Sequence, residues 1–150
     1  MQIQKIPFEV LILESDGLFR SALEQELKRV IERLPLNVLY QFKFHVYDQP
    51  GSFEGFLEAA QSEASNFIAF VNQRFEKNLF EDLLSRATTN LNQKLKSIIL
   101  ASSKEEMLES RRYWNNKTNF DFIVKNDYSL SICGVLFEQY LVSSSYVGNS

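Results

Sequence analysis

The clearest fold signal in this chain lies in residues 8–34, FEVLILESDGLFRSALEQELKRVIERL. The beginning of this stretch, 8–13, is a short apolar run rich in β-forming side chains, which predicts a strand. After Asp16 and Gly17, apolar residues recur every three or four positions as far as Leu34, the spacing of an amphipathic helix. Pro35 then predicts the end of that helix. A strand followed at once by a helix of this length is the beginning of a βαβ unit.

The same alternation continues along the chain. Further strands are predicted at 39–47, 67–71, 98–101 and 120–124. Helices are predicted at 52–60, 78–91, from 103 to about 114, and 130–142. The strand at 39–47 alternates apolar and polar side chains, as expected at a sheet edge, whereas 67–71 is apolar on both faces. We therefore predict a doubly wound, flavodoxin-like (βα)₅ fold of the α/β class, with three layers and a parallel sheet in the order 2-1-3-4-5.

Length and composition agree with one compact domain. The chain has 150 residues and only 5 Gly and 3 Pro, which argues against a turn-rich sandwich or barrel. Neither Gly nor Pro occurs between Gly55 and Gly134. We expect a single domain over 1–150, with its core at about 8–142 and a flexible tail at 143–150.

Composition also narrows the classes of function. The net charge is −3, and the longest basic runs, Lys28–Arg29 and Arg111–Arg112, are short, so a nucleic-acid surface is not expected. The single cysteine, Cys133, excludes an internal disulfide and a CxxC metal site, and we expect it to be a core thiol. No apolar stretch approaches the length of a membrane span. We expect a cytoplasmic protein without membrane contact.

Candidate site residues are those that follow each predicted strand, because ligands in such folds bind beyond the carboxyl ends of the strands. These residues are Glu14, Ser15 and Asp16 after the first strand, Asn72 after the third, Ser102 after the fourth and Lys125 after the fifth. His45 instead lies on the polar side of the edge strand, where we expect a surface histidine rather than a catalytic base.

Residues 10–27, VLILESDGLFRSALEQEL, resemble the opening of a response-regulator receiver domain, and the correspondence runs from about 8 to 142. The resemblance implies that Glu14 and Ser15 occupy the positions of two acidic residues that hold Mg²⁺ in that family. It places Ser102, or Ser103 if the register shifts by one, at a hydroxyl position. Lys125 matches the family's lysine after the last strand, and Phe122 its aromatic switch residue.

Two departures from the family pattern concern its chemistry. The phosphoacceptor position holds Asn72, or Val71 in the alternative register, and no Asp or Glu occurs from Ala64 to Phe75. An amide cannot act as the carboxylate nucleophile of phosphoryl transfer. The metal pair is reduced to Glu14 and Ser15, since Asp16 is better placed to cap the following helix. We therefore expect no enzymatic activity, no catalytic residue, no metal and no cofactor.

These departures favour a pseudo-receiver, a signalling or regulatory module of two-component type that acts by protein–protein interaction without phosphorylation. In that interpretation Lys125 forms an ion pair with Glu14 or Asp16. The alternative is a receiver-like domain that still binds a small anion, a metal or a phosphoryl group in the crevice. No glycine-rich phosphate loop supports that alternative. An unrelated flavodoxin-like enzyme is a weaker third reading, because no catalytic set of side chains converges.

A partner surface is suggested by Arg111, Tyr113 and Trp114 at the end of the fourth helix, since Arg, Tyr and Trp dominate binding hot spots. Packing of Trp114 against the core is the alternative. In the family that these residues resemble, helix 4, strand 5 and helix 5 commonly form the surface for dimerisation or output. The expected partners are therefore signalling proteins, or a second copy of this chain through that surface.

Overall fold

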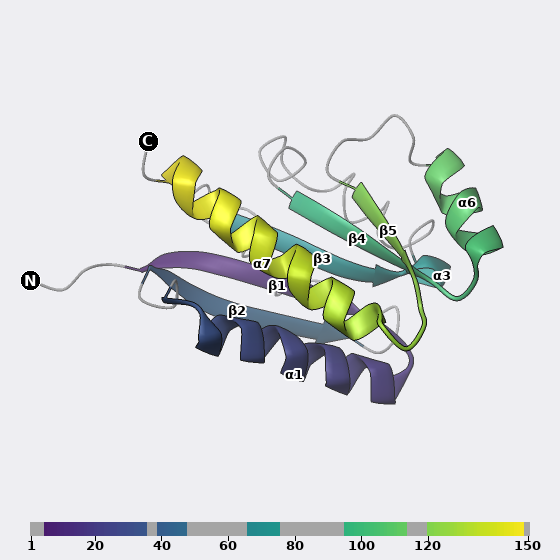
Figure 1. Ribbon diagram of the computed structural model, residues 1–150, viewed down its shortest axis with the longest axis horizontal. Coiled ribbons are helices and arrows are strands. Elements are labelled where there is room, and N and C mark those ends of the chain that lie inside the picture. The colour runs from purple at the N-terminus through teal and green to yellow at the C-terminus, as the bar shows by residue number, and fades with distance from the viewer. Residues whose placement is uncertain (1–4, 36–38, 48–65, 76–94, 114–119, 149–150) are drawn as a thin grey trace, which may run out of the picture.

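The computed structural model describes residues 5–35, 39–47, 66–75, 95–113 and 120–148 (Figure 1). Its strands are β1 (Ile6–Leu13), β2 (Tyr40–Tyr47), β3 (Asn66–Asn72), β4 (Leu95–Ala101) and β5 (Phe120–Val124). They form one parallel sheet in the order β2-β1-β3-β4-β5, as the alternation of strand and helix signals predicted. The fold class is therefore confirmed as doubly wound and flavodoxin-like.

The helices are α1 (Gly17–Arg33), the short α3 (Gln73–Phe75), α6 (Lys104–Tyr113) and α7 (Ser129–Gly148). The helices predicted at 52–60 and 78–91 lie outside the described residues. α6 packs against β4 and β5. None of the helices in the described ranges is long and apolar enough to cross a membrane.

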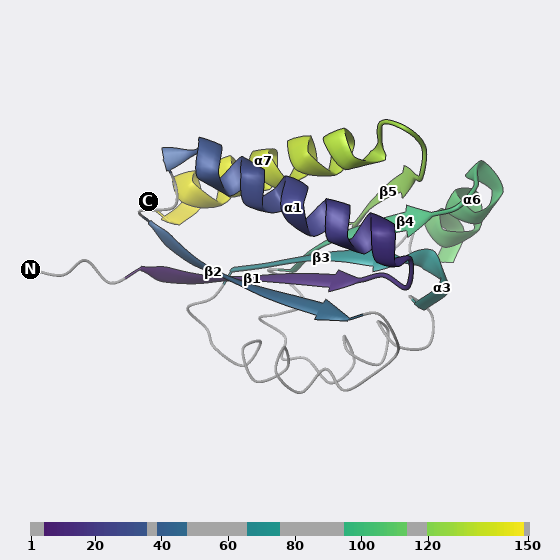
Figure 2. The ribbon, with the colours of Figure 1, turned by 90° about the horizontal axis from the view of Figure 1, so that it is seen from below.

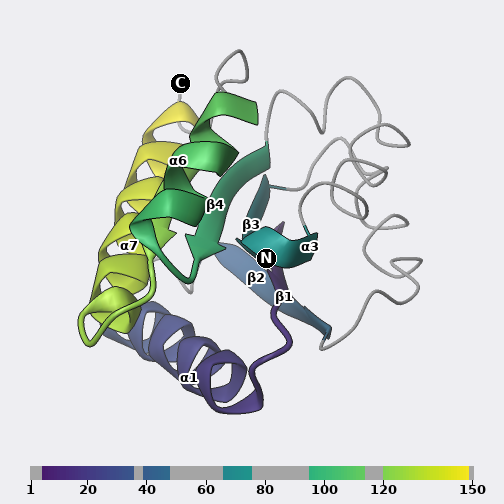
Figure 3. The same cartoon turned by 90° about the vertical axis from the view of Figure 1, so that its right-hand side faces the viewer.

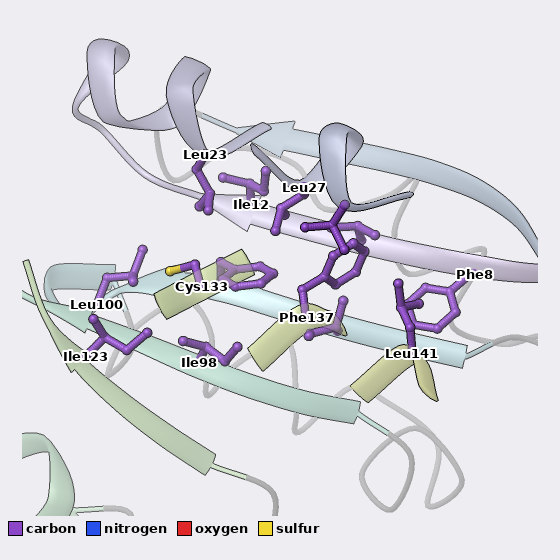
Figure 4. Packing of buried hydrophobic residues seen from close by; sticks show 14 of the residues in the cluster. Phe8, Ile12, Leu23, Leu27, Ile98, Leu100, Ile123, Cys133, Phe137 and Leu141 are labelled. Carbon is purple, nitrogen blue, oxygen red and sulfur yellow. The ribbon is translucent and has the colours of Figure 1, made fainter. Parts of the chain in front are cut away.

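α1 and α7 lie side by side over one face of the sheet (Figure 2). The core under them is a cluster of apolar side chains from both helices and all five strands, among them Phe8, Ile12, Leu27, Ile98, Leu100, Phe137 and Leu141 (Figure 4). The Phe137 ring packs edge-on against Phe8 and Phe70, with centroids 6.2 and 6.4 Å away. Gly134 of α7 lies close to α1, because a Cβ there would stand only 2.9 Å from the Glu26 Oε1 atom and that side chain would have to shift.

The position of β2 at the edge of the sheet is also confirmed. Gln41 and Lys43 are exposed on it, whereas Phe42 and Phe44 are half-buried against the core. Central β3 is buried on both faces from Phe67 onward. The exposed polar side chains on the side of β2 away from the core cluster agree with its place at the edge of the sheet.

Side-chain caps fix where α1 and α6 begin. The Asp16 carboxylate accepts hydrogen bonds from the N–H groups of Leu18 (3.1 Å) and Phe19 (3.2 Å). The Ser103 hydroxyl accepts from the Glu106 N–H at 3.2 Å, while the Glu106 carboxylate accepts from the Ser102 N–H at 2.9 Å. The predicted Asp16 cap is therefore present, and Ser103 caps α6, although Glu106 reaches one residue further back than in the usual capping box.

The last helix is longer than predicted. α7 continues to Gly148, so residues 143–148 are helical where the sequence suggested a tail from 143 onward. Serine disfavours a helix only moderately, so the serines at 143–145 do not end α7. The first residue after Val142 that strongly disfavours a helix is Gly148, the last residue of α7. The predicted tail at 143–150 is therefore helical as far as Gly148.

Candidate functional site

Three side chains from separate strand ends meet at the carboxyl edge of the sheet. Glu14 follows β1, Asn72 is the last residue of β3, and Lys125 follows β5. These residues, called the crevice cluster below, lie where the fold is expected to place its ligand crevice. The sequence had named all three as candidates.

Glu14 is the centre of the crevice cluster. Its side chain is fully buried, and its Oε1 atom forms an ion pair with the Lys125 ammonium group. The Asn72 side-chain amide donates to Oε2 at 2.6 Å, and the Asp16 N–H donates to the same oxygen at 3.3 Å. Both carboxylate oxygens are therefore engaged, which a buried charge requires.

Lys125 connects β5 to the start of α1. Its side chain is 19% exposed, and its Nζ atom lies 4.6 Å from the centroid of the Phe19 ring, in a cation–π contact. The Lys125 N–H also donates to the Ala101 carbonyl at 2.8 Å. The predicted ion pair with Glu14 is confirmed, whereas the role of Phe19 was missed because its helical spacing marked it only as a core residue.

Asn72 uses both ends of its amide. While its Nδ2 atom donates to Glu14, its Oδ1 atom accepts from the Arg74 N–H at 2.9 Å. Arg20 reinforces the neighbouring turn, since its Nη1 atom donates to the Glu14 carbonyl at 2.9 Å. A carboxylate in place of the Asn72 amide would have no hydrogen to offer Glu14, so the amide fits this position for a specific reason.

The other predicted site residues lie outside the crevice cluster or cap a helix by accepting hydrogen bonds from backbone N–H groups. Ser15 and Asp16 are exposed, and Asp16 is engaged as the cap of α1. Ser102 directly follows β4 and is exposed. Ser103 caps α6, so Ser102 is the residue that places a hydroxyl group at the end of β4. Phe122 is half-buried on β5, opposite Ile99 of β4.

The suggested partner surface is described only in part. Arg111 is exposed in the last turn of α6, and the α6 backbone ends at Tyr113. Trp114 lies outside the described residues. The placement of Arg111 near a helix carboxyl end is also favourable for its charge, whatever its binding role.

The residues of the crevice cluster do not fit the Mg²⁺ ion that the family resemblance implies. Mg²⁺ is bound through carboxylates with octahedral geometry, and here Glu14 is the one carboxylate of the cluster, with Lys125 and Asn72 on its oxygens. One negative and one positive charge leave the cluster neutral. Within the described ranges, no three His, Cys, Asp or Glu side chains come together as a metal site.

A second buried polar pair lies on the opposite face of the sheet from α1 and α7. The His45 Nε2 atom is 2.7 Å from the Glu9 Oε2 atom, and both side chains are buried. The expectation of a surface histidine was therefore wrong. The alternation along β2 correctly predicted that His45 lies on the face away from the core cluster. Its burial could not be predicted in the same way, because its partner Glu9 is on β1, far away in the sequence.

The fold of this chain is similar to that of a solved structure. The chain is similar to the crystal structure of a response regulator receiver domain from Rhodospirillum rubrum, with a TM-score of 0.55 over 92% of this chain and 94% of that chain. This chain has the receiver-domain fold. The sequence identity is 13%, so the likeness concerns the fold alone. No protein-family model matches this chain, and a search of curated proteins finds no match either.

Proposed function

We propose that this protein is a receiver-like regulatory module of two-component type that acts through protein contacts and does not accept a phosphoryl group. The similarity to a receiver domain supports the first half of this proposal. The second half rests on one observation, the Asn72 amide that donates to the buried Glu14 carboxylate at the end of β3.

The chemistry of the crevice cluster argues against phosphoryl transfer. An acyl phosphate needs a free carboxylate at the end of β3, and an amide nitrogen engaged in a hydrogen bond is not a nucleophile. The Lys125 ammonium group is already paired with Glu14, so it is not available to an incoming anion without breaking that pair. The same pairing disfavours the alternative of a small-anion or metal site.

The direct test is incubation with acetyl phosphate and Mg²⁺, followed by intact mass spectrometry. We expect no mass increase of one phosphoryl group, since the acceptor carboxylate is missing. A stoichiometric adduct would contradict the proposal. The matched variant carries Asn72→Asp together with Ser15→Asp, which returns carboxylates to the two positions where this chain departs from the family pattern. Tryptic mapping of any adduct locates the modified residue.

We further propose that partner proteins contact the end of α6, around Arg111, Tyr113 and Trp114. Exposure of Arg111 and the residue types support this assignment. A pull-down from native cells with the wild type and Trp114→Ala tests it. We expect Trp114→Ala to lose the partner and keep the unfolding midpoint, whereas a large drop in the midpoint would identify Trp114 as a core residue.

A further inference from the structure

The outer edge of β2 carries backbone groups that no described strand bonds. β1 pairs with β2 over its whole length, from Tyr40 to Tyr47, in one unbroken parallel register. β2 is the outermost strand of the sheet, and no described element continues the sheet beyond it (Figure 1 and Figure 3). The described sheet therefore ends in a strand of eight residues with a row of N–H and C=O groups along its free side.

The hydrogen bonds to β1 show which residues present these groups. The Leu39 carbonyl accepts from the Ile6 N–H at 2.9 Å. The Tyr47 carbonyl accepts from the Glu14 N–H at 3.1 Å. Because the backbone groups of successive residues point to opposite sides of a strand, the odd-numbered residues of β2 bond to β1. The N–H and C=O groups of the even-numbered residues point outward, and these residues are Tyr40, Phe42, Phe44 and Val46.

β2 has few of the features that usually protect an edge strand. Its sequence, YQFKFHVY, contains no proline, and its register against β1 has no bulge. Tyr, Phe and Val are among the residue types that favour strands most. Lys43 is the single Lys, Arg, Asp or Glu of the strand. The backbone of β2 is thus suited to pair with a further strand, and the side chains beside its edge determine which strand fits.

The side of β2 that faces the core cluster favours apolar neighbours. Phe42, Phe44 and Val46 are half-buried on that side and pack against the cluster. A strand added beside β2 would place every second side chain next to this row. Apolar side chains at those positions would remove more of the row from water.

The other side of β2 favours a negative charge. Lys43 is exposed there, and among the described residues no carboxylate forms an ion pair with it. Glu9 lies opposite Lys43 in the register of β1 and β2, but its carboxylate pairs with His45 instead. The neighbouring Gln41 is exposed and uncharged. An acidic side chain opposite Lys43 on a new strand would therefore form a cross-strand ion pair.

A second copy of this chain fits the edge poorly. Two β2 strands related by a two-fold axis pair antiparallel, with their outward-facing groups together. The two longest overlaps of this kind place Lys43 opposite either Lys43 or His45 of the copy. Neither arrangement gives Lys43 a carboxylate, because β2 contains no Asp or Glu. Like charges opposite each other destabilise a strand pair, so the edge favours a different chain.

We propose that β2 binds an extended segment of a partner protein as an additional strand of the sheet, with an acidic side chain of that segment opposite Lys43. Backbone hydrogen bonds supply the affinity of such strand addition, and alternate side chains supply its specificity. This surface lies at the opposite margin of the sheet from α6, which packs against β4 and β5. The inference does not depend on whether the chain accepts a phosphoryl group.

Fluorescence anisotropy with a synthetic peptide tests this docking. The probe is Val-Thr-Val-Glu-Val-Thr-Val, labelled through a Ser-Gly-Ser spacer, which as a strand has its valines on one face and its glutamate on the other. The comparison peptide carries Lys in place of Glu. We expect the wild type to bind the Glu peptide at least about fivefold more tightly than the Lys peptide.

Charge reversal on the protein assigns this preference to β2. Lys43→Glu should prefer the Lys peptide, because the charge opposite the central residue is then negative. Lys104→Glu is the matched control, since it makes the same change at an exposed residue in the first turn of α6 and should keep the wild-type preference. Far-UV circular dichroism should be the same for all three proteins. A preference that Lys43→Glu leaves unchanged would overturn the proposal, as would the absence of binding at millimolar peptide.

N-methylated peptides distinguish strand addition from other contacts. One peptide is methylated on its valine nitrogens and the other on its glutamate and threonine nitrogens, so that in either strand direction only one set faces β2. One of the two should lose binding while the other keeps it, and equal binding of both would contradict strand addition.

Amide hydrogen exchange locates the contact on the protein. Saturation with the Glu peptide should slow exchange of the Phe42, Phe44 and Val46 amides, because these groups gain hydrogen-bond partners. Slow exchange of these amides in the dilute free protein would overturn the proposal, by showing that the edge is already covered. Protection that appears on concentration without peptide would also overturn it, by assigning the edge to a second copy of this chain.

Discussion

Lys125 and Glu14 form an ion pair between the ends of two strands that are not neighbours in the sheet. β3 and β4 lie between β1 and β5, so this pair reaches across the carboxyl ends of two intervening strands. Glu14 is fully buried, while Lys125 keeps some contact with water. A buried carboxylate depends on its partners, because an unpaired charge in the interior costs several kcal/mol.

Lys125→Met should destabilise the protein strongly. The substitution keeps an apolar chain beside Phe19 but leaves one oxygen of the buried Glu14 carboxylate without a cation. We expect the free energy of unfolding to fall by about 3 kcal/mol, measured by urea denaturation. The double variant Lys125→Met with Glu14→Gln should recover part of this loss, because no charge then remains buried.

Lys28→Met is the matched control for that experiment. Lys28 also pairs with a glutamate, Glu24, at 2.7 Å, but both side chains are on the surface of α1. Exposed helix pairs contribute only about 0.3–0.5 kcal/mol. If Lys125→Met cost no more than Lys28→Met, the buried pair would not support the fold in the way argued above.

Asn72→Asp should make stability depend on pH in a way that the wild type does not show. The variant replaces the amide donor with a second carboxylate beside Glu14, so at neutral pH two like charges face each other. We expect a loss of about 2 kcal/mol at pH 7. Adding one proton to the pair relieves the repulsion, so the difference from the wild type should shrink as the pH falls.

Urea titrations of both proteins at several pH values measure this effect. Asn126→Asp is the control, because Asn126 is exposed in the turn before α7. A loss for Asn72→Asp that stays constant as the pH falls would show that the two carboxylates do not interact.

Cys133 should be almost unreactive in the native state. Burial raises the pKa of its thiol from 9.0 to about 12. At pH 8 the folded protein should therefore react with a disulfide reagent about a thousandfold more slowly than the protein in urea. Because the folded pKa is the higher one, this group leaves stability unchanged below pH 9 and reduces it as the pH rises from 9 to 12. Fast native labelling would mean that α7 separates readily from the sheet.

The order of the sheet could be predicted because the apolar and polar pattern of a strand indicates how many of its faces are buried. β3 is apolar on both faces and β2 on one, so their central and edge positions followed from solvent contact alone. The end of α7 could not be placed in the same way. A run of serines lowers helix propensity only slightly, and the packing of the preceding turns decides whether the helix continues through it.

The crevice cluster could be predicted in its members but not in its contacts. Glu14, Asn72 and Lys125 were found because a parallel sheet brings its carboxyl ends together. The cation–π contact of Lys125 with Phe19 depends on how α1 leaves the strand, which no local pattern specifies. The Glu9–His45 pair was missed for a related reason, since its two residues are 36 positions apart and come from adjacent strands.

His45→Leu should therefore be costly, although the residue lies on an edge strand. It removes the partner from the Glu9 carboxylate, which is itself buried, and we expect a loss of about 2 kcal/mol in the free energy of unfolding. Lys43→Leu is the control, because Lys43 lies on the same face of β2, opposite Glu9 in register, but is exposed. It should change stability by less than about 0.5 kcal/mol. Equal effects of the two substitutions would mean that the Glu9–His45 contact contributes nothing specific to the sheet.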